Sequence, residues 1–530
     1  MTYRLLILEG MTDRGQAVLD AEGWTLDQKK AMPPAELAKI IGDYDAVTIR
    51  SGTKFTAEVV AAAKKLRVIG RPGVGVDNVD VEAATRAGIF VMNSPGGNLV
   101  STCELTMALI LATSRNIGAA DASLKAGTWD RKAFAGGAEI SGKRIGIVGF
   151  GRIGREVAAR CKAFGMEVWA FDPFVSAQVA ERVGVQVATL DQILENCDYI
   201  TLHTVMTPDT RHMLGKAAFA RIKPGARIIN AARGELIDED ALFEALESGR
   251  VAGCGLDVHA KEPPVDWKIA KHPKVVATPH IGAQTIEAQD RVGTDIAYQV
   301  RDFLKDGVIQ QAVNFFQLSG EAYDQIKPAI DLGERLGSFL GQVAPGEVRK
   351  VEVTLYGTFK DLQAQPILQA TVAGALKVTD PEITFVNAMA RAESRGVEAS
   401  QAASSSSMRH PNLMGVRITT SETELGVAGT LFGEGQLRLV EIDGISVDAV
   451  LHGHILSIKN DDTPGVVGRI GTTLGENGVN IAQMNLGRKA AGGRAVMLIE
   501  VDADVPEAVL DSLRKIAGVR EARAITLGPA

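Results

Sequence analysis

The chain has little cysteine, and its four cysteines show no pairing. Cys103, Cys161, Cys197 and Cys254 are scattered over 530 residues without a Cys-x-x-Cys motif, each in an apolar or helical context. This usage is typical of buried free thiols in a reducing compartment, and it offers no metal-ligand spacing. We therefore expect neither disulfide bonds nor a metal site.

Long apolar runs and an excess of positive charge are also missing. No apolar run reaches the roughly 18 residues of a membrane-spanning helix, and the opening MTYRLLILEG enters a strand pattern without a targeting signal. We expect a cytoplasmic protein that does not bind membranes. The formal net charge of −7 disfavours nucleic-acid binding, which depends on neutralising phosphates. At the usual domain size, the chain should hold roughly three or four domains.

One stretch, residues 143–172, organises the rest of the chain. A short apolar strand pattern is followed by Gly149, Gly151 and Gly154, spaced G-x-G-x-x-G, then by a helix pattern and a second strand ending at Asp172. The glycines permit a tight turn, the approach of a pyrophosphate and close packing of the helix, whose N-terminus attracts phosphate. A carboxylate at Asp172 suits ribose hydroxyls and repels a 2′-phosphate, so the stretch predicts NAD rather than NADP.

Alternating strand and helix patterns predict two doubly wound, parallel-sheet domains of the Rossmann-like α/β class. A long helix from about residue 285 should return the chain to the first sheet. The predicted substrate-binding domain is then discontinuous, residues 1–98 and 284–316, around a nucleotide-binding domain at residues 99–283. The active cleft is expected between them, beyond the carboxyl ends of the strands.

The pattern changes after residue 316. Residues 317–451 mix helix and strand patterns and predict an α+β domain. Within it, the small-polar segment 399–407 is interpreted as a solvated loop; the alternative is a serine-rich turn near Arg409 and His410 that holds an anion. Residues 452–530 alternate as βαββαβ, which predicts a ferredoxin-like sandwich.

Polar side chains stand at the predicted carboxyl ends of three strands. Arg233, in NAARGE, has a planar guanidinium that suits a carboxylate bidentately. His280, in TPHIG, can transfer a proton near neutral pH. Asp257 also ends a strand and should face the cleft. The alternatives are a surface arginine in loop contacts and a structural histidine.

The motifs together resemble a known family. The glycine motif with Arg152 and Ile153, NAARGELIDEDAL, GLDVHAKEPP and TPHIGAQT resemble the D-isomer-specific 2-hydroxyacid dehydrogenases over residues 1 to about 315. GRPGVGVDNVD and NSPGGNLVSTCE resemble the branch that oxidises 3-phosphoglycerate. Residues 318–450 resemble the intervening domain of its long form, and DDTPGV with the later Asn480 resembles an ACT regulatory domain.

The resemblance implies a role for each matching residue. Arg233 is the carboxylate anchor, His280 the general acid/base and Glu262 its partner. The implied cofactor-binding residues are Gly149, Gly151, Arg152, Ile153, Gly154, Asp172, Thr204, Ala231 and Asp257, and the implied substrate-binding residues are Arg50, Ser51, Val74, Gly75 and Asn98. Arg131 and Lys132 are further candidates for the substrate phosphate, from a neighbouring subunit; a solvated charge pair is the alternative.

The implied reaction is NAD-dependent oxidation of 3-phospho-D-glycerate to 3-phosphooxypyruvate, the first step of the phosphorylated route to L-serine, in a homo-oligomer (dimer or tetramer). Asp462 and Asn480 are the implied regulatory residues and L-serine the expected effector, although Asn460 stands where some relatives carry an aromatic residue. Three alternatives stay open: a related dehydrogenase for glycerate, lactate or another 2-keto acid, a non-catalytic NAD-sensing co-regulator, and a C-terminal module that only dimerises.

Overall fold

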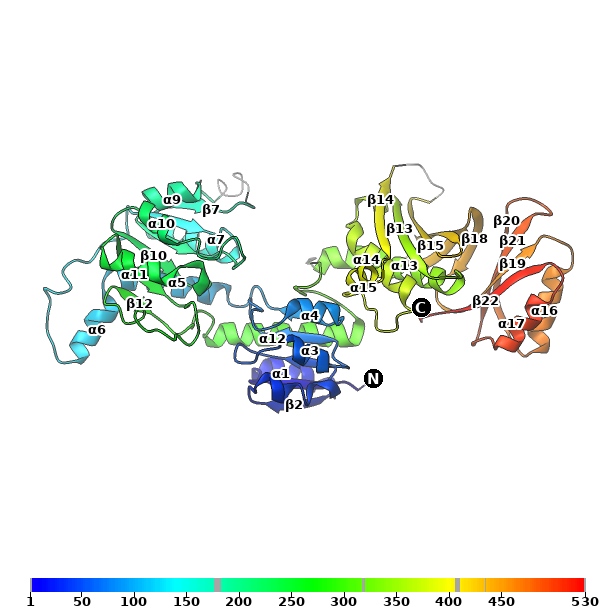
Figure 1. The fold of residues 1–530 in the computed structure, drawn as a ribbon, viewed down its shortest axis with the longest axis horizontal. Coiled ribbons are helices and arrows are strands. Elements are labelled where there is room, and N and C mark those ends of the chain that lie inside the picture. Colours follow the sequence, from blue (N-terminus) through cyan, green and yellow to red (C-terminus); the bar gives the residue numbers. More distant parts are fainter. Residues whose placement is uncertain (1, 176–182, 317–319, 406–409, 434, 529–530) are drawn as a thin grey trace.

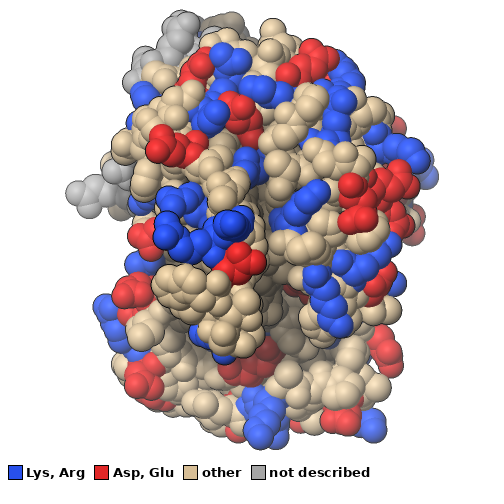
Figure 2. Space-filling view, turned by 90° about the vertical axis from the view of Figure 1, so that its left-hand side faces the viewer, with Lys and Arg blue, Asp and Glu red and all other residues tan. Residues whose placement is uncertain are grey.

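The computed structural model describes residues 2–175, 183–316, 320–405, 410–433 and 435–528. Four domains lie in a row, with the nucleotide-binding domain at one end and the C-terminal domain at the other (Figure 1). On the face seen in Figure 2, basic and acidic side chains are interspersed. The charge of this face is therefore mixed rather than gathered into a patch of one sign.

The first sheet is parallel and doubly wound. Its strands are β1 (Arg4–Leu8), β2 (Thr25–Lys29), β3 (Ala46–Thr48), β4 (Val68–Arg71) and β5 (Phe90–Asn93), in the order β2-β1-β3-β4-β5, with helices α1 (Asp13–Asp20), α2 (Pro34–Leu37), α3 (Ala57–Ala62) and α4 (Val81–Arg86). Successive side chains of β1 enter different cores: Leu5 and Ile7 belong to one cluster, and Leu6 and Leu8 to another. Both faces of the sheet are therefore buried, as a doubly wound fold requires.

The second sheet holds the glycine motif. Its elements are β6 (Arg144–Val148), α7 (Arg152–Ala163), β7 (Glu167–Phe171), β8 (Gln186–Val187), α9 (Leu190–Asn196), β9 (Tyr199–Leu202), α10 (Lys216–Arg221), β10 (Ala226–Asn230), α11 (Glu239–Glu247), β11 (Val251–Leu256) and β12 (Val275–Ala277). The parallel order is β12-β11-β10-β9-β6-β7-β8. The direction of winding reverses between β6 and β9, and ligands bind at such a switch point.

Two long helices connect the two sheets. Helix α5 (Leu99–Ser114) leads into the second domain, followed by the short α6 (Ile117–Lys125). Helix α12 (Ile286–Asp306), capped by the Thr285 hydroxyl, buries Ile296, Val300 and Phe303 against the core of the first sheet. The first domain is thus built from two separate parts of the chain, and the exact domain limits stay a prediction.

The third domain combines a mixed sheet with two packed helices. Its elements are α13 (Gly320–Val343), β13 (Val348–Gly357), α14 (Ala364–Leu376), α15 (Ala388–Ser394), β14 (Glu398–Ser404), β15 (Asn412–Thr420), β16 (Glu424–Phe432), β17 (Gln436–Ile442) and β18 (Ile445–Val450), with the sheet order β14-β13-β15-β16-β17-β18. A Cβ added at Gly337 would lie 2.1 Å from the Thr371 carbonyl oxygen, so α13 and α14 approach closely only because glycine stands there.

The predicted solvated loop at residues 399–407 is wrong over most of its length. Residues 398–404 form the edge strand β14, which pairs in parallel with β13 from Lys350↔Glu398 to Tyr356↔Ser404. The backbone ladder forms this strand, although its side chains carry no apolar alternation. The serine-rich turn and Arg409 fall largely outside the described residues.

The C-terminal domain is the predicted ferredoxin-like sandwich. Its elements are β19 (Gly453–Asp461), α16 (Val466–Glu476), β20 (Ile481–Arg488), β21 (Arg494–Val501), α17 (Glu507–Arg514) and β22 (Val519–Leu527), in the sheet order β20-β21-β19-β22. Leu456 and Ile458 face the helices, whereas Ile455 and Leu498 join the core that continues into the third domain. The predicted fold class is therefore confirmed for all four domains.

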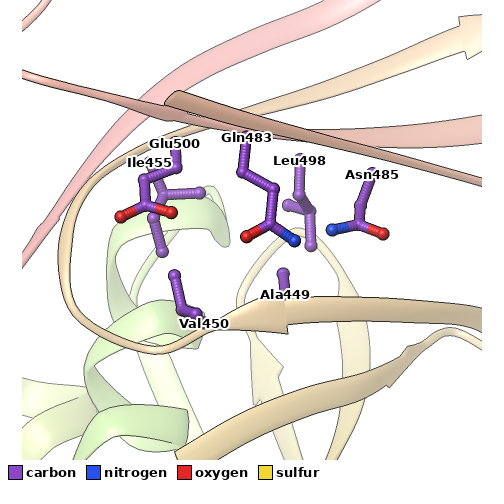
Figure 3. Close-up of a pocket in the computed structure, with 7 residues that line it drawn as sticks. All are labelled: Ala449, Val450, Ile455, Gln483, Asn485, Leu498 and Glu500. Carbon is purple, nitrogen blue, oxygen red and sulfur yellow. The ribbon is translucent and has the colours of Figure 1, made fainter. Parts of the chain in front are cut away.

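The C-terminal domain docks on β18 through its open sheet face. Ala449 and Val450 of β18 lie below Ile455, Gln483 and Leu498, and together with Asn485 and Glu500 they line a small pocket (Figure 3). A second contact joins Gln342 of α13 to the backbone of Thr526, with distances of 2.9 and 3.0 Å. This domain therefore contacts the third domain directly.

The four cysteines are free and buried, as expected from the sequence. Burial raises the pKa of Cys103 to about 11 and the pKa values of Cys161 and Cys197 to about 12, so these thiols stay protonated. In the part of the chain that the structure describes, no helix is both long and apolar enough to cross a membrane. Within the same residues, no cluster of three or more His, Cys, Asp or Glu side chains could hold a metal ion.

Candidate active site

The turn between β6 and α7 forms a cradle whose three glycines have different surroundings. Gly149 has φ +94°, and a Cβ there would lie 2.6 Å from the carbonyl carbon of His203. A Cβ at Gly154 would lie 2.2 Å from the Gly149 oxygen, whereas a Cβ at Gly151 would meet no atom within 4 Å. Protein packing thus requires the first and third glycines, and the second borders open space at the N-terminus of α7, which suits a pyrophosphate.

Asp172 stands just beyond β7 and is tied to this cradle. Its Oδ2 accepts a hydrogen bond from the Phe150 backbone N–H at 2.8 Å, and its Oδ1 accepts one from Phe174 at 2.9 Å. The carboxylate is thereby fixed beside the glycine turn, where the sequence predicted a contact with the adenosine ribose.

The other predicted cofactor residues follow the same sheet edge. Arg152 and Ile153 form the first turn of α7, and Thr204, Ala231 and Asp257 follow β9, β10 and β11. Because these strands are parallel, their carboxyl ends meet at one edge. The residues present therefore fit a dinucleotide along the cradle.

A histidine and a glutamate form a pair on the wall of the cleft. His280 Nδ1 lies 2.6 Å from Glu262 Oε2, and Glu262 Oε1 accepts a hydrogen bond from the His259 N–H at 3.1 Å. The hydrogen bond to Glu262 raises the pKa of His280 above its ordinary value, although partial burial opposes the shift. Burial acts to raise the pKa of Glu262, but the hydrogen bond and charge of His280 outweigh it and lower that pKa. The pair thus stabilises the imidazolium that forms when the ring takes up a proton.

Asp257 holds the loop that carries His280. Its Oδ1 accepts hydrogen bonds from the Thr278 hydroxyl at 2.6 Å and the Ile281 N–H at 2.8 Å, and its Oδ2 accepts one from the Gly282 N–H at 2.8 Å. His280 itself has φ +56°, a left-handed conformation that is uncommon for a residue with a side chain. The buried carboxylate therefore fixes a turn that presents the imidazole.

Arg233 reaches from the second domain to the first. Its Nη2 and Nε lie 3.0 and 3.2 Å from Asp77 Oδ2, and its Nη1 donates to the Ala232 carbonyl at 2.7 Å. A Cβ added at Gly75 would lie 2.0 Å from Arg233 Nη2, so the predicted substrate loop lies directly against the guanidinium. Two predicted site residues from different domains are thereby brought together.

The remaining predicted substrate residues lie on loops of the first domain. The Asn78 amide donates to the Arg50 carbonyl at 2.9 Å, and the Arg50 guanidinium donates to Gln289 of α12. The Val74 carbonyl accepts from Asn93 at 2.6 Å, and Ser51 is exposed. Asn98 precedes α5, and its side-chain oxygen is buried without a hydrogen-bond partner in the described part of the chain.

Three family models match consecutive parts of the chain. Residues 107–282 match the NAD-binding domain of D-isomer-specific 2-hydroxyacid dehydrogenases, residues 325–443 the D-3-phosphoglycerate dehydrogenase intervening domain, and residues 454–518 the ACT domain. The chain is 38% identical to a D-3-phosphoglycerate dehydrogenase of Bacillus subtilis, over 99% of this chain and 100% of that protein. It is 39% identical to one of Methanocaldococcus jannaschii over the same shares. The chain belongs to the D-3-phosphoglycerate dehydrogenase family.

Solved structures agree for the first two domains. A glyoxylate reductase from Paecilomyes thermophila is 32% identical with a TM-score of 0.55, covering 59% of this chain and 99% of that one. A D-lactate dehydrogenase from Aquifex aeolicus, solved with NAD and lactic acid, is 26% identical with a TM-score of 0.53, covering 57% and 96%. The predicted family and the NAD cofactor are therefore confirmed.

Sequence reasoning missed three residues that lie close to predicted site residues of the first and second domains. Asp77 pairs with Arg233, and Gln289 accepts a hydrogen bond from Arg50. Arg71 is the last residue of β4, at the carboxyl edge of the first sheet. Asp77 lies two residues beyond the predicted Gly75, so its closeness to a predicted site residue was the available signal. Arg71 ends an apolar strand, so its position at a strand end was the available signal. Arg131 and Lys132 are exposed beyond α6, and no contact among the described residues joins them to the cleft.

The two predicted regulatory residues are not brought together. Asp462 Oδ2 accepts hydrogen bonds from the Gly492 N–H at 2.9 Å and from Arg488 Nη1 at 2.6 Å, and these two contacts lower the pKa of Asp462. Asn480 instead donates to Asp502 at 2.8 Å. Each residue therefore has its own partner within the ACT domain.

Proposed function

We propose that this chain oxidises 3-phospho-D-glycerate at C2 with NAD, giving 3-phosphooxypyruvate and NADH, the first step of the phosphorylated route to L-serine. The observation that carries the proposal is the 2.6 Å His280–Glu262 pair on the cleft wall from which Arg233 crosses to the substrate loop. Full-length similarity to D-3-phosphoglycerate dehydrogenases supports the choice of substrate.

In the mechanism, Arg233 exchanges Asp77 for the substrate carboxylate and so fixes the C2 hydroxyl beside His280. Since Nδ1 of His280 is occupied by Glu262, Nε2 receives the hydroxyl proton. Glu262 stabilises the imidazolium that forms, and Asp257 keeps the loop in place. Bound NAD supplies the acceptor for the hydride that leaves C2.

The cradle residues would hold the cofactor. The N–H groups at the start of α7 and Arg152 would bind the pyrophosphate, and Asp172 would accept hydrogen bonds from the ribose hydroxyls. Thr204, Ala231 and Asp257, at the ends of successive strands, would line the remainder of the site toward the nicotinamide.

A substrate panel tests the proposal. The full-length chain is mixed with NAD and, in turn, 3-phosphoglycerate, D-glycerate and D-lactate, and NADH absorbance is followed. We expect the highest kcat/KM with 3-phosphoglycerate. A higher value with glycerate or lactate would indicate a related dehydrogenase, and no reduction of NAD with any substrate would indicate the non-catalytic co-regulator.

The ACT domain supports a second part of the proposal, feedback by L-serine. Asp462 and Asn480 would bind the effector, but only after exchanging their present partners Arg488, Gly492 and Asp502. Calorimetry with L-serine, with D-serine as the control, tests this role. No heat of binding with L-serine would favour a C-terminal module that only dimerises.

A third part is a homo-oligomer that uses helix α6. No residue of this helix is buried, and Ile117, Leu124 and the nearby Trp129 are 52%, 59% and 78% exposed. If a second copy of the chain covers this apolar surface, Arg131 and Lys132 of one subunit would lie near the cleft of the other subunit. Light scattering should give a molar mass greater than that of one chain, and Trp129→Ser should lower this mass. An unchanged mass in the variant would place the interface elsewhere.

A further inference from the structure

A second imidazole lies next to the histidine–glutamate pair. His259 follows β11 on the loop that leads to Glu262, and only 9% of the residue is exposed. Its backbone N–H donates to Glu262 Oε1 at 3.1 Å. In the part of the chain that the structure describes, neither ring nitrogen of His259 makes a hydrogen bond. The chain thus buries an ionisable ring beside the carboxylate of the pair, and the mechanism given above has no role for it.

The backbone holds His259 in this place from two sides. A Cβ added at Gly234 would lie 2.0 Å from the carbonyl carbon of His259, so any side chain at position 234 would displace the loop. The next backbone N–H along the loop donates to Glu239 Oε1, on the first turn of α11, at 2.9 Å. His259 is therefore fixed between the loop after β10 and the carboxylate of Glu262.

Glu262 serves both imidazoles. Its Oε2 lies 2.6 Å from His280 Nδ1, and its Oε1 accepts the N–H of His259. Burial acts to raise the pKa of Glu262, but the hydrogen bonds and the charges of His280 and His259 outweigh it and lower that pKa. One carboxylate carries one negative charge and cannot fully balance two imidazolium ions, so the protonation of one ring affects that of the other.

The other charged groups around this loop are engaged elsewhere. They are Arg233 after β10, Glu239 on α11 and Asp257 after β11. Arg233 pairs with Asp77 at 3.0 Å, and Glu239 accepts the backbone N–H described above. Asp257 accepts the backbone N–H groups of Ile281 and Gly282, each at 2.8 Å. Glu262 is thus the carboxylate that joins His259 to His280.

We propose that His259 is a positioning residue that acts through Glu262 and sets the pH at which His280 can accept the proton of the substrate hydroxyl. The inference rests on the proposed function and adds a residue to its acid–base machinery. Protonated His259 takes up part of the negative charge of Glu262, so the imidazolium of His280 is stabilised less. Neutral His280, the form that oxidation requires, then persists to lower pH than it would beside Glu262 alone.

The first test is the pH profile of kcat/KM for 3-phosphoglycerate over about pH 5 to 9, where histidine titrates. His259→Phe keeps the aromatic ring and the backbone N–H but removes the second titrating group. Its acid limb should move about half a unit to higher pH, so kcat/KM on the acid side falls about threefold while the plateau stays within about twofold. His259→Gln, which is polar but uncharged, should shift the limb in the same direction.

A double variant tests whether Glu262 transmits the effect. In the background of Glu262→Gln, adding His259→Phe should move the acid limb by less than about 0.2 units, because the carboxylate that joins the two rings is absent. The matched control is His272→Gln, since His272 is also buried and pairs with a glutamate, Glu247, at 3.0 Å but away from the cleft. This control should leave the limb in place.

A second measurement needs no substrate. Diethyl pyrocarbonate acylates a neutral imidazole and not its protonated form, and mass spectrometry of the peptide that contains His280 gives the rate of modification at each pH. The midpoint of this rate should be at higher pH in His259→Phe than in the wild-type protein, by about the same half unit as the kinetic limb. Thermal unfolding and NAD binding check that the variants are folded.

The outcomes separate this inference from the function on which it rests. Midpoints of His259→Phe that stay in place or move to lower pH would overturn the role of His259, and so would an equal loss of activity at every pH, which packing alone explains. A shift that persists in full without the Glu262 carboxylate would overturn the action through Glu262. Wild-type protein that does not oxidise 3-phosphoglycerate would overturn the proposed function, and the modification of His280 would still decide the role of His259.

Discussion

The catalytic cleft and the ACT domain differ in how some of their polar side chains are paired. In the cleft, Arg71 Nε and Asn98 Oδ1 are buried without partners among the described residues, and the carboxylate that pairs with Arg233 is mostly exposed. In the ACT domain, Asp462 and Asn480 are each bound to a neighbour. A ligand entering the cleft can complete unpaired groups and displaces one exposed partner, Asp77, whereas an effector at the ACT site must displace the partners of both proposed ligand-binding residues.

This difference predicts large effects in the cleft and small ones in the ACT domain. His280→Ala should lower kcat by about 10²- to 10⁴-fold, since it removes the general base. The matched control is His272→Ala, because His272 also pairs with a glutamate, Glu247, at 3.0 Å but away from the cleft. Turnover measured at saturating substrate checks this, and near-normal turnover of His280→Ala would remove the imidazole from the chemistry.

Glu262→Gln should lower kcat less than His280→Ala does, and it should change the pH profile of kcat/KM. Hydrogen bonds to charged groups contribute about 1.5–3 kcal/mol, so kcat should fall roughly ten- to a hundredfold. Glu262 raises the pKa of His280, and oxidation requires the neutral imidazole, so the wild-type rate rises with pH through that raised value. The variant should shift the acid limb of the kcat/KM profile to lower pH. An unmoved limb would mean that another group titrates there.

Asp172→Asn should alter the choice of cofactor. The neutral amide keeps the size of the side chain but removes the charge that repels a 2′-phosphate, so KM for NAD should rise about five- to tenfold. The ratio of kcat/KM values for NAD and NADP should narrow. Should that ratio stay constant, another residue discriminates between the two cofactors.

Asp77→Asn tests the ion pair between Arg233 and Asp77. Asp77 is mostly exposed, so its competition with the substrate carboxylate for Arg233 is weak, and KM for 3-phosphoglycerate should fall by at most about fivefold. Asp43→Asn, on the surface of the same domain, is the control. A rise in KM would show that Asp77 orients Arg233 instead of competing for it.

Arg488→Ala should have the smallest effect. It removes one of the two contacts that hold Asp462, so L-serine should bind about two- to threefold more tightly in calorimetry, as expected for an exposed ion pair. Weaker binding of L-serine would place Arg488 itself in the effector site and would remove the contrast between the two regions.

Local patterns identified most of the fold and predicted several candidate catalytic positions. The glycine spacing, the apolar strands and the polar residues that follow them are readable because each depends on only a few neighbouring residues. The strand β2 (TLDQK) is not readable in this way, since it is an exposed edge strand with one apolar residue. The prediction for the edge strand β14 was wrong for the same reason, because backbone pairing rather than the pattern of side chains decides its structure.

The sequence by itself determined that the chain has a dinucleotide cradle, because turn, helix and carboxylate lie within about 30 residues of one another. Only the tertiary structure decided that Arg233 meets Asp77, 156 residues away, that Arg71 Nε has no hydrogen-bond partner among the described residues, and that Asp462 is held by Arg488. Such partners are set by how separate loops meet at the ends of the strands, and no local pattern of residues encodes that meeting.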